Sequence, residues 1–233
     1  MFTKSLLRLS TRTTTSAVAR PILLQLPLQQ RQSLATAAMS GIIQSVLQDH
    51  KEIDAYYQKY KQNAGNYDEQ KKWANQLIWE VARHSAAEEL VLYPAIEDKL
   101  SDGKALADAA RAQHQDVKND LYKLDQMSLK SASDSGAFDT QLRKVMDDLT
   151  RHIREEEEVD LPKLKAAISS TESTKMAQEF ERTKLLVPTR PHPSAPDKPP
   201  FETVAGLMAA PLDKLRDVFR SFPSKEEVRK AEE

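Results

Sequence analysis

One sequence pattern occurs twice in this 233-residue chain. The segments HSAAEELVLYP and HIREEEEVDLP begin at His84 and His152, and they agree in Glu four and five positions later, Val seven later and Pro ten later. Side chains four residues apart lie on one face of a helix. Each copy therefore directs an imidazole and a carboxylate toward one point, which is the arrangement of a metal-ligand pair.

Another histidine precedes each copy, namely His50 in QDHKEI and His114 in AQHQDV. The spacing from His50 to His114 is 64 residues, close to the 68 residues from His84 to His152. The chain thus has the pattern of a duplicated helical hairpin. In each half the first helix supplies one histidine, and the second supplies a histidine and a glutamate.

Apolar residues recur at helical spacing in four segments. These segments are residues 41–62, 68–99, the stretch from the break at 101–103 to 126, and 138–167. Short connections between helices of this length favour antiparallel neighbours, so we predict an all-α, up-down-up-down four-helix bundle. Ser40 is a candidate cap of the first helix, and we expect Pro94 and Pro162 to kink or end their helices beyond the ligand pairs. The polar stretch KSASDSG at 130–136 is predicted to be a loop.

The candidate ligands fall near one level of this bundle. With a rise of about 1.5 Å per helical residue, their distances from the three turns agree along all four helices. Unpaired imidazoles and carboxylates are costly in a core, and a shared metal site gives all of them a partner. The six residues are His50, His84, Glu88, His114, His152 and Glu156.

Four imidazoles and two carboxylates suit iron better than calcium or magnesium, which prefer oxygen ligands. Two glutamates able to bridge indicate two ions, with His50 and His84 on one, His114 and His152 on the other, and both glutamates spanning them. Zinc and manganese are the alternatives, although one zinc would leave ligands over. The chain has no cysteine, which excludes thiolate-bound zinc, cysteine-ligated clusters and disulfides.

The order of these motifs resembles the hemerythrin-like, or HHE cation-binding, domain over about residues 40–168. The resemblance implies two non-haem iron ions with an oxo or hydroxo bridge, held by the same six residues, and interaction with dioxygen, peroxide or nitric oxide. One position departs from the oxygen carriers, because Lys118 stands where they have a second histidine after His114. The irons would then have nearly equal protein ligands and more open positions, which favours sensing, iron handling or stress protection over reversible oxygen carriage.

Acidic residues next to the ligands are candidates for orienting a ligand histidine through its other ring nitrogen. They are Glu89, Glu155, Glu157 and Glu158, and a solvated helix face is the alternative interpretation. Tyr57 and Tyr122, two turns beyond His50 and His114, are interpreted as core aromatics.

The first 39 residues contain five basic residues, many Ser and Thr, and no acidic residue. This composition favours a mitochondrial transit peptide, with a disordered basic segment as the alternative, and Met39 could start a cytosolic form. Without this segment 29 basic residues face 35 acidic ones, which disfavours nucleic acid as a partner. We find no transmembrane segment in the sequence.

We divide the rest of the chain into a bundle at 40–184, a Pro-rich linker at 185–203, and an amphipathic helix with a tail at 204–233. His192 lies between two prolines and is interpreted as a bystander. Pro211 is placed in the first turn of the last helix. Residues 204–222 are expected to dock on the bundle, or else to contact a protein or a membrane surface.

The sequence leaves three functions open. The first is a di-iron protein that binds or reacts with oxygen species or nitric oxide. The second is an iron-regulated interaction module that uses the C-terminal helix. The third is a helical scaffold in which the histidines and glutamates are relics. No substrate pocket can be recognised, so the sequence does not decide whether the chain is an enzyme.

Overall fold

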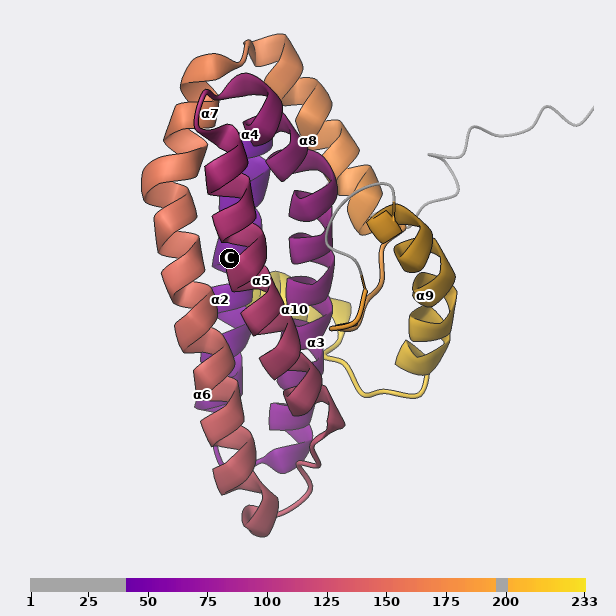
Figure 1. Ribbon diagram of the computed structural model, residues 1–233. Coiled ribbons are helices and arrows are strands. Elements are labelled where there is room, and N and C mark those ends of the chain that lie inside the picture. Colours follow the sequence, from indigo (N-terminus) through magenta and orange to yellow (C-terminus); the bar gives the residue numbers. More distant parts are fainter. Residues whose placement is uncertain (1–40, 196–200) are drawn as a thin grey trace, which may run out of the picture.

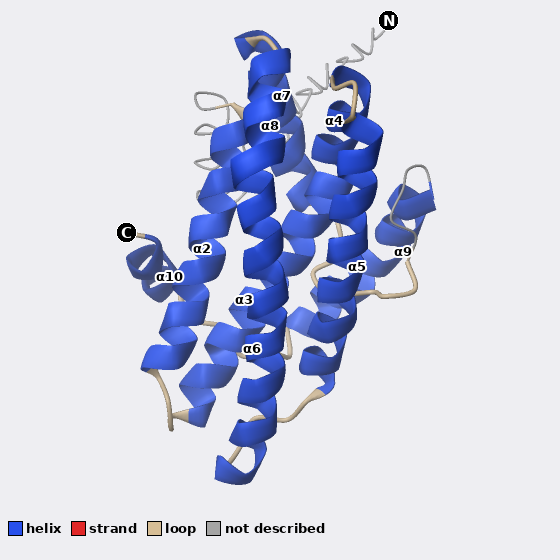
Figure 2. Cartoon of the chain, turned by 60° about the vertical axis from the view of Figure 1, so that its left-hand side comes forward, coloured by secondary structure: helices blue, strands red, loops and turns tan. Residues whose placement is uncertain are grey.

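The computed structural model describes residues 41–195 and 201–233. The predicted targeting segment and Ser40 lie outside these residues. Within them every regular element is helical, which confirms the predicted all-α class (Figure 2). Among the described residues, no helix has both the length and the apolar character needed to cross a membrane.

Four long helices form the body of the molecule (Figure 1). Helix α2 packs along α3, α5 packs along α6, and α3 also contacts α5. Their bounds are Ile42–Gln62 for α2, Tyr67–Ala87 for α3, Gly103–Gln126 for α5 and Ala132–Glu155 for α6. The turn before α3 ends at Asn66, whose side chain accepts a hydrogen bond from the Glu69 backbone N–H and so caps the helix.

Helices α3 and α6 each continue through a π-helical turn into a further helix. The turns are η2, Glu88–Leu92, and η3, Glu156–Asp160, and the helices that follow are α4, Tyr93–Lys99, and α7, Leu161–Ala167. Pro94 and Pro162 lie at the start of α4 and α7. The prolines therefore do not end these helices, because the wider turn before each one accommodates a residue that lacks an N–H group.

The core consists of two apolar clusters with a polar layer between them. On α2, Ile42 and Val46 belong to one cluster, and Ile53 belongs to the other. His50 lies between them on the same helix. The same order holds on α3 and α5, where His84 and His114 each separate a residue of one cluster from a residue of the other. His152 likewise lies between Leu149 of one cluster and Leu161 of the other, and Leu161 is on α7. The histidines therefore share one level of the bundle, as the spacing predicted.

Helix α8, Ser170–Lys184, lies against α2 and α3 and was not predicted, because the fourth predicted helix ends at residue 167. It begins at a capping box, in which Ser169 and Glu172 exchange hydrogen bonds through side chain and backbone. Gly41, at the start of α2, has a φ of 62°. A Cβ atom there would come within 2.5 Å of the Ser173 hydroxyl, so both the backbone angle and the close approach of α8 require glycine.

Three sequence predictions are wrong in detail. Helix α6 begins at Ala132, inside the predicted loop, because the Asp134 carboxylate accepts a hydrogen bond from the Lys130 backbone N–H and stabilises the first turn. Tyr122 is 45% exposed and is no core residue, whereas Tyr57 packs against the core. Pro211 lies inside a helix and not in its first turn.

The C-terminal region forms two helices, α9 at Phe201–Asp217 and α10 at Lys225–Glu232. Helix α10 packs against α2, and α9 lies on the other side of the bundle (Figure 2). The loop between them is also attached, since Asn75 donates a hydrogen bond of 2.8 Å to the Ser221 carbonyl. Of the segment 204–222 that was expected to dock, Ser221 contacts the bundle through this hydrogen bond. Helix α10 lies beyond that segment, and its packing against α2 was not predicted.

Candidate metal centre

The six predicted ligands come from all four helices of the bundle and meet in its interior. His50 lies on α2, His84 on α3, His114 on α5 and His152 on α6, while Glu88 and Glu156 open the two π turns. Each of the six has at most 5% of its surface exposed. The side chains are thus shielded from water, so a cation held among them would depend on the protein for its ligands.

Glu88 lies between two pairs of histidines. Its Oε1 atom is 3.2 Å from His84 Nε2 and 4.0 Å from His50 Nε2. Its Oε2 atom is 3.3 Å from His114 Nε2, which is itself 3.0 Å from His152 Nε2. Two groups able to hold a metal ion therefore share this carboxylate, one with His50 and His84 and the other with His114 and His152.

Glu156 lies at the same centre but belongs to neither of these groups. Its Oε2 atom is 3.3 Å from His50 Nε2. The structure thus brings Glu156 to the first pair of histidines, and its predicted role as a second bridge stays a prediction.

The donor set fits a metal because several inward-facing atoms lack another partner. His50 Nε2, His84 Nε2, Glu88 Oε1 and both carboxylate oxygens of Glu156 are buried and make no hydrogen bond to any described residue. Leaving buried polar groups unsatisfied costs about 1 to 3 kcal/mol each. Five such atoms around one point are best explained by a cation that they would coordinate.

Each histidine has a hydrogen-bond partner at its outward nitrogen, Nδ1. His84 Nδ1 is 3.2 Å from Asp49 Oδ2, and His114 Nδ1 is 3.0 Å from Glu89 Oε1. The other two contacts are 2.8 Å each, from His50 Nδ1 to Glu157 Oε1 and from His152 Nδ1 to Gln113 Oε1. Because carboxylate and amide oxygens accept hydrogen bonds, each Nδ1 carries a proton, and Nε2 is the nitrogen of each ring that would bind a metal.

These partners follow the duplication of the sequence. Asp49 and Gln113 each precede a lone histidine by one residue, whereas Glu89 and Glu157 each follow a ligand glutamate. Of the adjacent acids, Glu89 and Glu157 contact a histidine Nδ1, as the orienting role requires, and the role itself stays a prediction. Glu155 acts one step further out, because it accepts a hydrogen bond of 2.6 Å from the Gln113 amide nitrogen, which turns the amide oxygen toward His152.

Tyr93 adds a hydroxyl group to the centre. Its oxygen is 2.9 Å from His114 Nε2, 3.4 Å from His152 Nε2 and 3.5 Å from Glu88 Oε2, and the side chain is fully buried. Burial and the nearby carboxylates of Glu88 and Glu156 raise the pKa of Tyr93 well above its usual value. The hydroxyl therefore stays protonated and can donate a hydrogen bond at the second pair of histidines.

The protonation of the centre is set by its neighbours. Burial lowers the pKa of His114, but hydrogen bonds to Glu88 and Glu89 outweigh it and raise the value to about 9. The pKa of His50 is likewise about 9, because Glu156 outweighs the effect of burial. His152 is the opposite case, since burial and the nearby His114 lower its pKa to about 3. A metal ion would replace the protons shared at the Nε2 atoms.

A separate cluster of three acidic residues is already paired with a lysine side chain. Asp49, Glu52 and Glu80 lie close enough to hold a metal, but the Lys184 ammonium is 2.6 and 2.8 Å from the two oxygens of Asp49 and 3.8 Å from Glu80 Oε1. Lys184 is the last residue of α8. Through Asp49, this helix therefore helps to fix the ring of His84.

The sequence prediction missed several residues that contact the ligands. They are Asp49, Gln113 and Tyr93. Lys184, which contacts Asp49, was missed as well. Comparing the two halves position by position would have indicated Asp49 and Gln113, and Tyr93 belongs to the quoted first copy. His192 does not reach the centre, in agreement with its interpretation, but its Nε2 atom is 2.7 Å from Asp213 Oδ2. Lys118 does not join the six predicted ligands. Its Nζ atom is 3.3 Å from Oε2 of Glu89, which contacts the outward nitrogen of His114.

Comparison with known proteins gives two matches. Residues 41–164 match the family described as the Hemerythrin HHE cation binding domain. The chain is also 46% identical over 191 residues to an uncharacterised hemerythrin-like protein of Schizosaccharomyces pombe, which covers 82% of this chain and 92% of that protein. No solved structure matches the chain.

Proposed function

Since this chain belongs to the hemerythrin HHE cation-binding family, we propose that it is a non-haem di-iron protein that binds or reacts with dioxygen, peroxide or nitric oxide. The observation that carries this proposal is the set of four inward-facing Nε2 atoms around the shared carboxylate of Glu88. In the proposal, His50 and His84 hold one iron, His114 and His152 hold the other, and Glu88 and Glu156 lie between them on an up-down-up-down bundle.

Bound iron would supply redox chemistry and open positions for small ligands. The protein would supply orientation and exclusion of water. The four contacts at Nδ1 fix the imidazole rings, and burial keeps water from the carboxylates. Tyr93 would hold a proton beside the second pair of histidines, where a small ligand could accept a hydrogen bond from it.

Sensing, iron handling or stress protection suits this centre better than reversible oxygen carriage. The position of Lys118 supports this choice, because its ammonium faces Glu89 on the outer side of His114 and offers no extra nitrogen ligand. Each metal would then have two histidines and shared carboxylates, with open positions on both.

Metal analysis of the purified protein tests the proposal. After expression in iron-replete cells we expect about two irons per chain and an absorption band of the oxidised centre that changes on addition of peroxide or nitric oxide. His84→Ala should remove most of the iron, whereas His192→Ala, which changes a histidine outside the centre, should retain it. A single tightly bound zinc and no iron in the wild-type protein would contradict the proposal.

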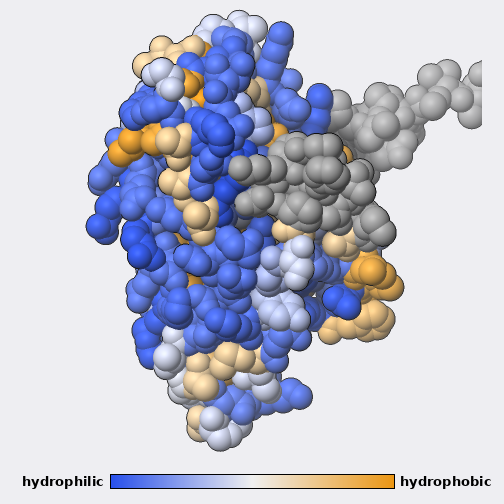
Figure 3. Space-filling view, in the orientation of Figure 1, coloured by the Kyte–Doolittle hydropathy of each residue, from blue (hydrophilic) through white to orange (hydrophobic). Residues whose placement is uncertain are grey.

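A second candidate function is an interaction module regulated by the metal. It is supported by the apolar residues that α9 and the residues just after it expose, including Val218 and Phe219 at 75% and 84% (Figure 3). If the metal controls this face, hydrogen exchange of residues 209–222 should differ between the iron-loaded and metal-free proteins. Identical exchange in the two states would exclude this function.

We also propose that residues 1–39 direct the protein to mitochondria, with the matrix as its destination. Their basic, acid-free composition supports this. A fluorescent protein fused after residue 39 should be imported, and fusion to residues 40–233 alone should stay in the cytosol. Import of the shorter fusion would contradict the proposal.

A further inference from the structure

A cavity of about 300 Å³ lies beside the metal centre. Its walls come from α3, η2, α5, the end of α8 and the segment that follows α8. His114 and Glu89 form part of the wall, so the cavity reaches the outer side of one ligand of the proposed iron site. No sequence pattern predicts this space, because its walls come from distant parts of the chain.

The cavity has an apolar body. Val81, Val117 and Leu121 lie on the bundle side and are at most 2% exposed, and Val187 on the opposite side is 5% exposed. A volume of this size lies at the lower end of small-molecule sites, which are mostly lined by apolar side chains with a few polar groups. The space therefore suits a small apolar molecule better than a sugar or a nucleotide.

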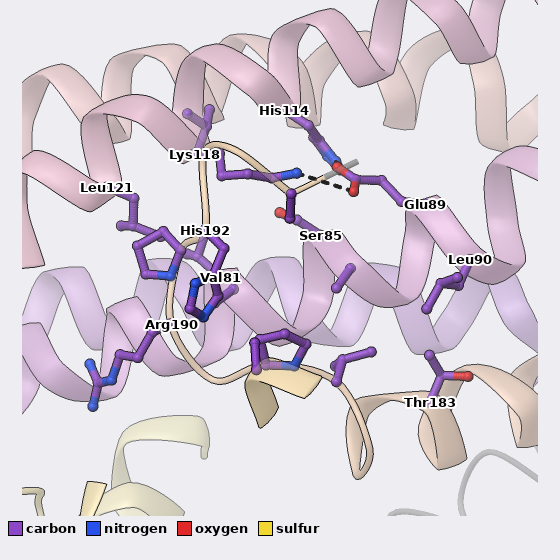
Figure 4. A pocket seen from close by; sticks show the side chains of 18 of the residues that line it. Val81, Ser85, Glu89, Leu90, His114, Lys118, Leu121, Thr183, Arg190 and His192 are labelled. Carbon is purple, nitrogen blue, oxygen red and sulfur yellow. Dashed lines mark hydrogen bonds and ion pairs between the residues drawn. The ribbon is translucent and has the colours of Figure 1, made fainter. Parts of the chain in front are cut away.

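One end of the cavity is polar. Lys118, Glu89, Ser85 and His114 gather there, and the Lys118 side chain extends toward Glu89 (Figure 4). The Lys118 side chain is 16% exposed, and its contact with Glu89 Oε2 is 3.3 Å long. An ammonium group has three donors, so Lys118 can bind a further acceptor while it keeps this contact.

The other basic side chains of the lining are engaged elsewhere. Arg190 donates to Asp217 at 2.8 Å and to Asp125 at 3.3 Å, and it points away from Lys118 (Figure 4). His192 is paired with Asp213. Among the described lining residues, Lys118 is thus the cation best placed to receive an anionic group.

The segment after α8 forms a roof that is fixed to the rest of the protein. Residues 187–195 are attached through the contacts of Arg190 and His192, through Thr189, which donates to Asp217 at 2.7 Å, and through the Pro193 carbonyl, which accepts from Gln115 at 3.1 Å. This Pro-rich stretch is therefore a packed wall and not only an extended linker. A preformed wall reduces the cost of ordering the site on binding.

We propose that this cavity binds a small molecule with an apolar body and a terminal carboxylate, and that Lys118 pairs with the carboxylate. The apolar walls would take the body, and the ammonium would form a charge-assisted hydrogen bond to the head group. Binding at this site does not require metal. Lys118 contacts Glu89, and Glu89 contacts the outward nitrogen of His114. If the proposed iron site is correct, a molecule bound to Lys118 would therefore be coupled to the metal centre through these two contacts.

Calorimetric titration of the full chain with octanoate, 1-octanol and octylamine tests this proposal, because the three probes share an apolar chain and differ in the head group. Octanoate should bind with saturation at about one molecule per chain and about tenfold more tightly than octanol, and octylamine should bind most weakly. The metal-free protein should show the same order, so a failure of the iron proposal would leave this test intact.

Two variants locate the binding. Lys118→Met should remove the preference for octanoate over octanol, and Ala82→Phe, which adds volume inside the cavity, should weaken both. Lys123→Met, on the same helix but 64% exposed at its side chain, is the matched control and should bind as the wild type does. Absence of saturable binding, equal affinity for octanoate and octanol, or an unchanged preference in folded Lys118→Met would overturn the proposal. If that variant does not fold, the three-probe comparison in the wild type still decides.

Discussion

Replacing Lys184 with methionine tests whether α8 stabilises the metal centre from outside. The ammonium of Lys184 is 2.6 Å from Asp49 Oδ1 and 3.4 Å from Glu181 Oε1, and its side chain is 6% exposed. Methionine keeps much of the length of the side chain but leaves the buried Asp49 carboxylate without this cation. Removing one partner of a buried ion pair costs about 3 to 5 kcal/mol, which for a domain of this size lowers the melting temperature by about 10 °C.

The loss should depend on pH in a defined direction. Burial alone would raise the pKa of Asp49, but Lys184 and the hydrogen bond from His84 hold it below its usual value. A carboxyl with a lowered pKa contributes stability above its unfolded pKa of about 3.9, and this contribution is lost as the pH falls. Without Lys184, burial dominates and Asp49 takes up a proton at higher pH. The difference between variant and wild type should therefore be largest near pH 7 and smaller near pH 4.5.

Urea unfolding of the metal-free proteins at these two pH values measures both effects. Lys163→Met is the matched control, because Lys163 pairs with Asp102 on the surface, where the two side chains are 43% and 51% exposed. Surface pairs contribute about 0 to 1 kcal/mol. If Lys184→Met loses no more than this control, or if its loss is the same at both pH values, the argument from a buried ion pair is refuted.

Three further predictions concern the centre itself. Tyr93→Phe removes the hydroxyl beside His114 Nε2 and should destabilise the metal-free protein by about 1 to 2 kcal/mol in urea unfolding; no change would show that this contact is unimportant. Because His50 and His114 have pKa values of about 9, zinc binding to the metal-free protein at pH 7 should release protons. Calorimetry in two buffers of different ionisation enthalpy measures this release, and identical heats would contradict it. Burial, and to a smaller extent the Glu156 carboxylate, raises the pKa of Asp160 to about 6. The ionised Asp160 side chain therefore destabilises the fold at pH 7. Asp160→Asn should therefore raise the stability of the metal-free protein at pH 7 by about 1 kcal/mol, reduced by solvent screening, and the gain should vanish at pH 4 in thermal melts.

The helical class and the shared depth of the histidines followed from the sequence because both depend on spacing. A histidine at a regular interval from a turn keeps that interval in the folded bundle. The start of α6 did not follow, since Ser, Asp and Gly occur both in loops and in first helical turns. Helix α8 was missed although Ser169 and Glu172 have the spacing of a capping box.

The centre was predictable as far as the repeat extends. Glu89 and Glu157 stand next to the ligand glutamates, so their role could be expected from the motif. The contact of Lys184 with Asp49 joins residues 135 positions apart, and no periodic pattern records such a pairing. The cavity was beyond reach for the same reason, because its roof and its polar end come from segments that only the tertiary fold brings together.

The two π turns have a consequence for changes in chain length. A π turn contains one residue more than an α turn, so deleting one residue between Glu88 and Leu92 would restore a regular α-helix. Because the π turn absorbs this extra residue, the residues that follow would keep about the same orientation around the helix axis. Tyr93 and Ile96, both at most 1% exposed, would then stay in the interior, whereas a deletion within the regular part of α3 would rotate them by about 100° relative to the start of that helix. A single deletion in η2 should therefore be tolerated better than one in α3, and the π turn is the place where this helix can lose a residue without turning its buried face away from the core.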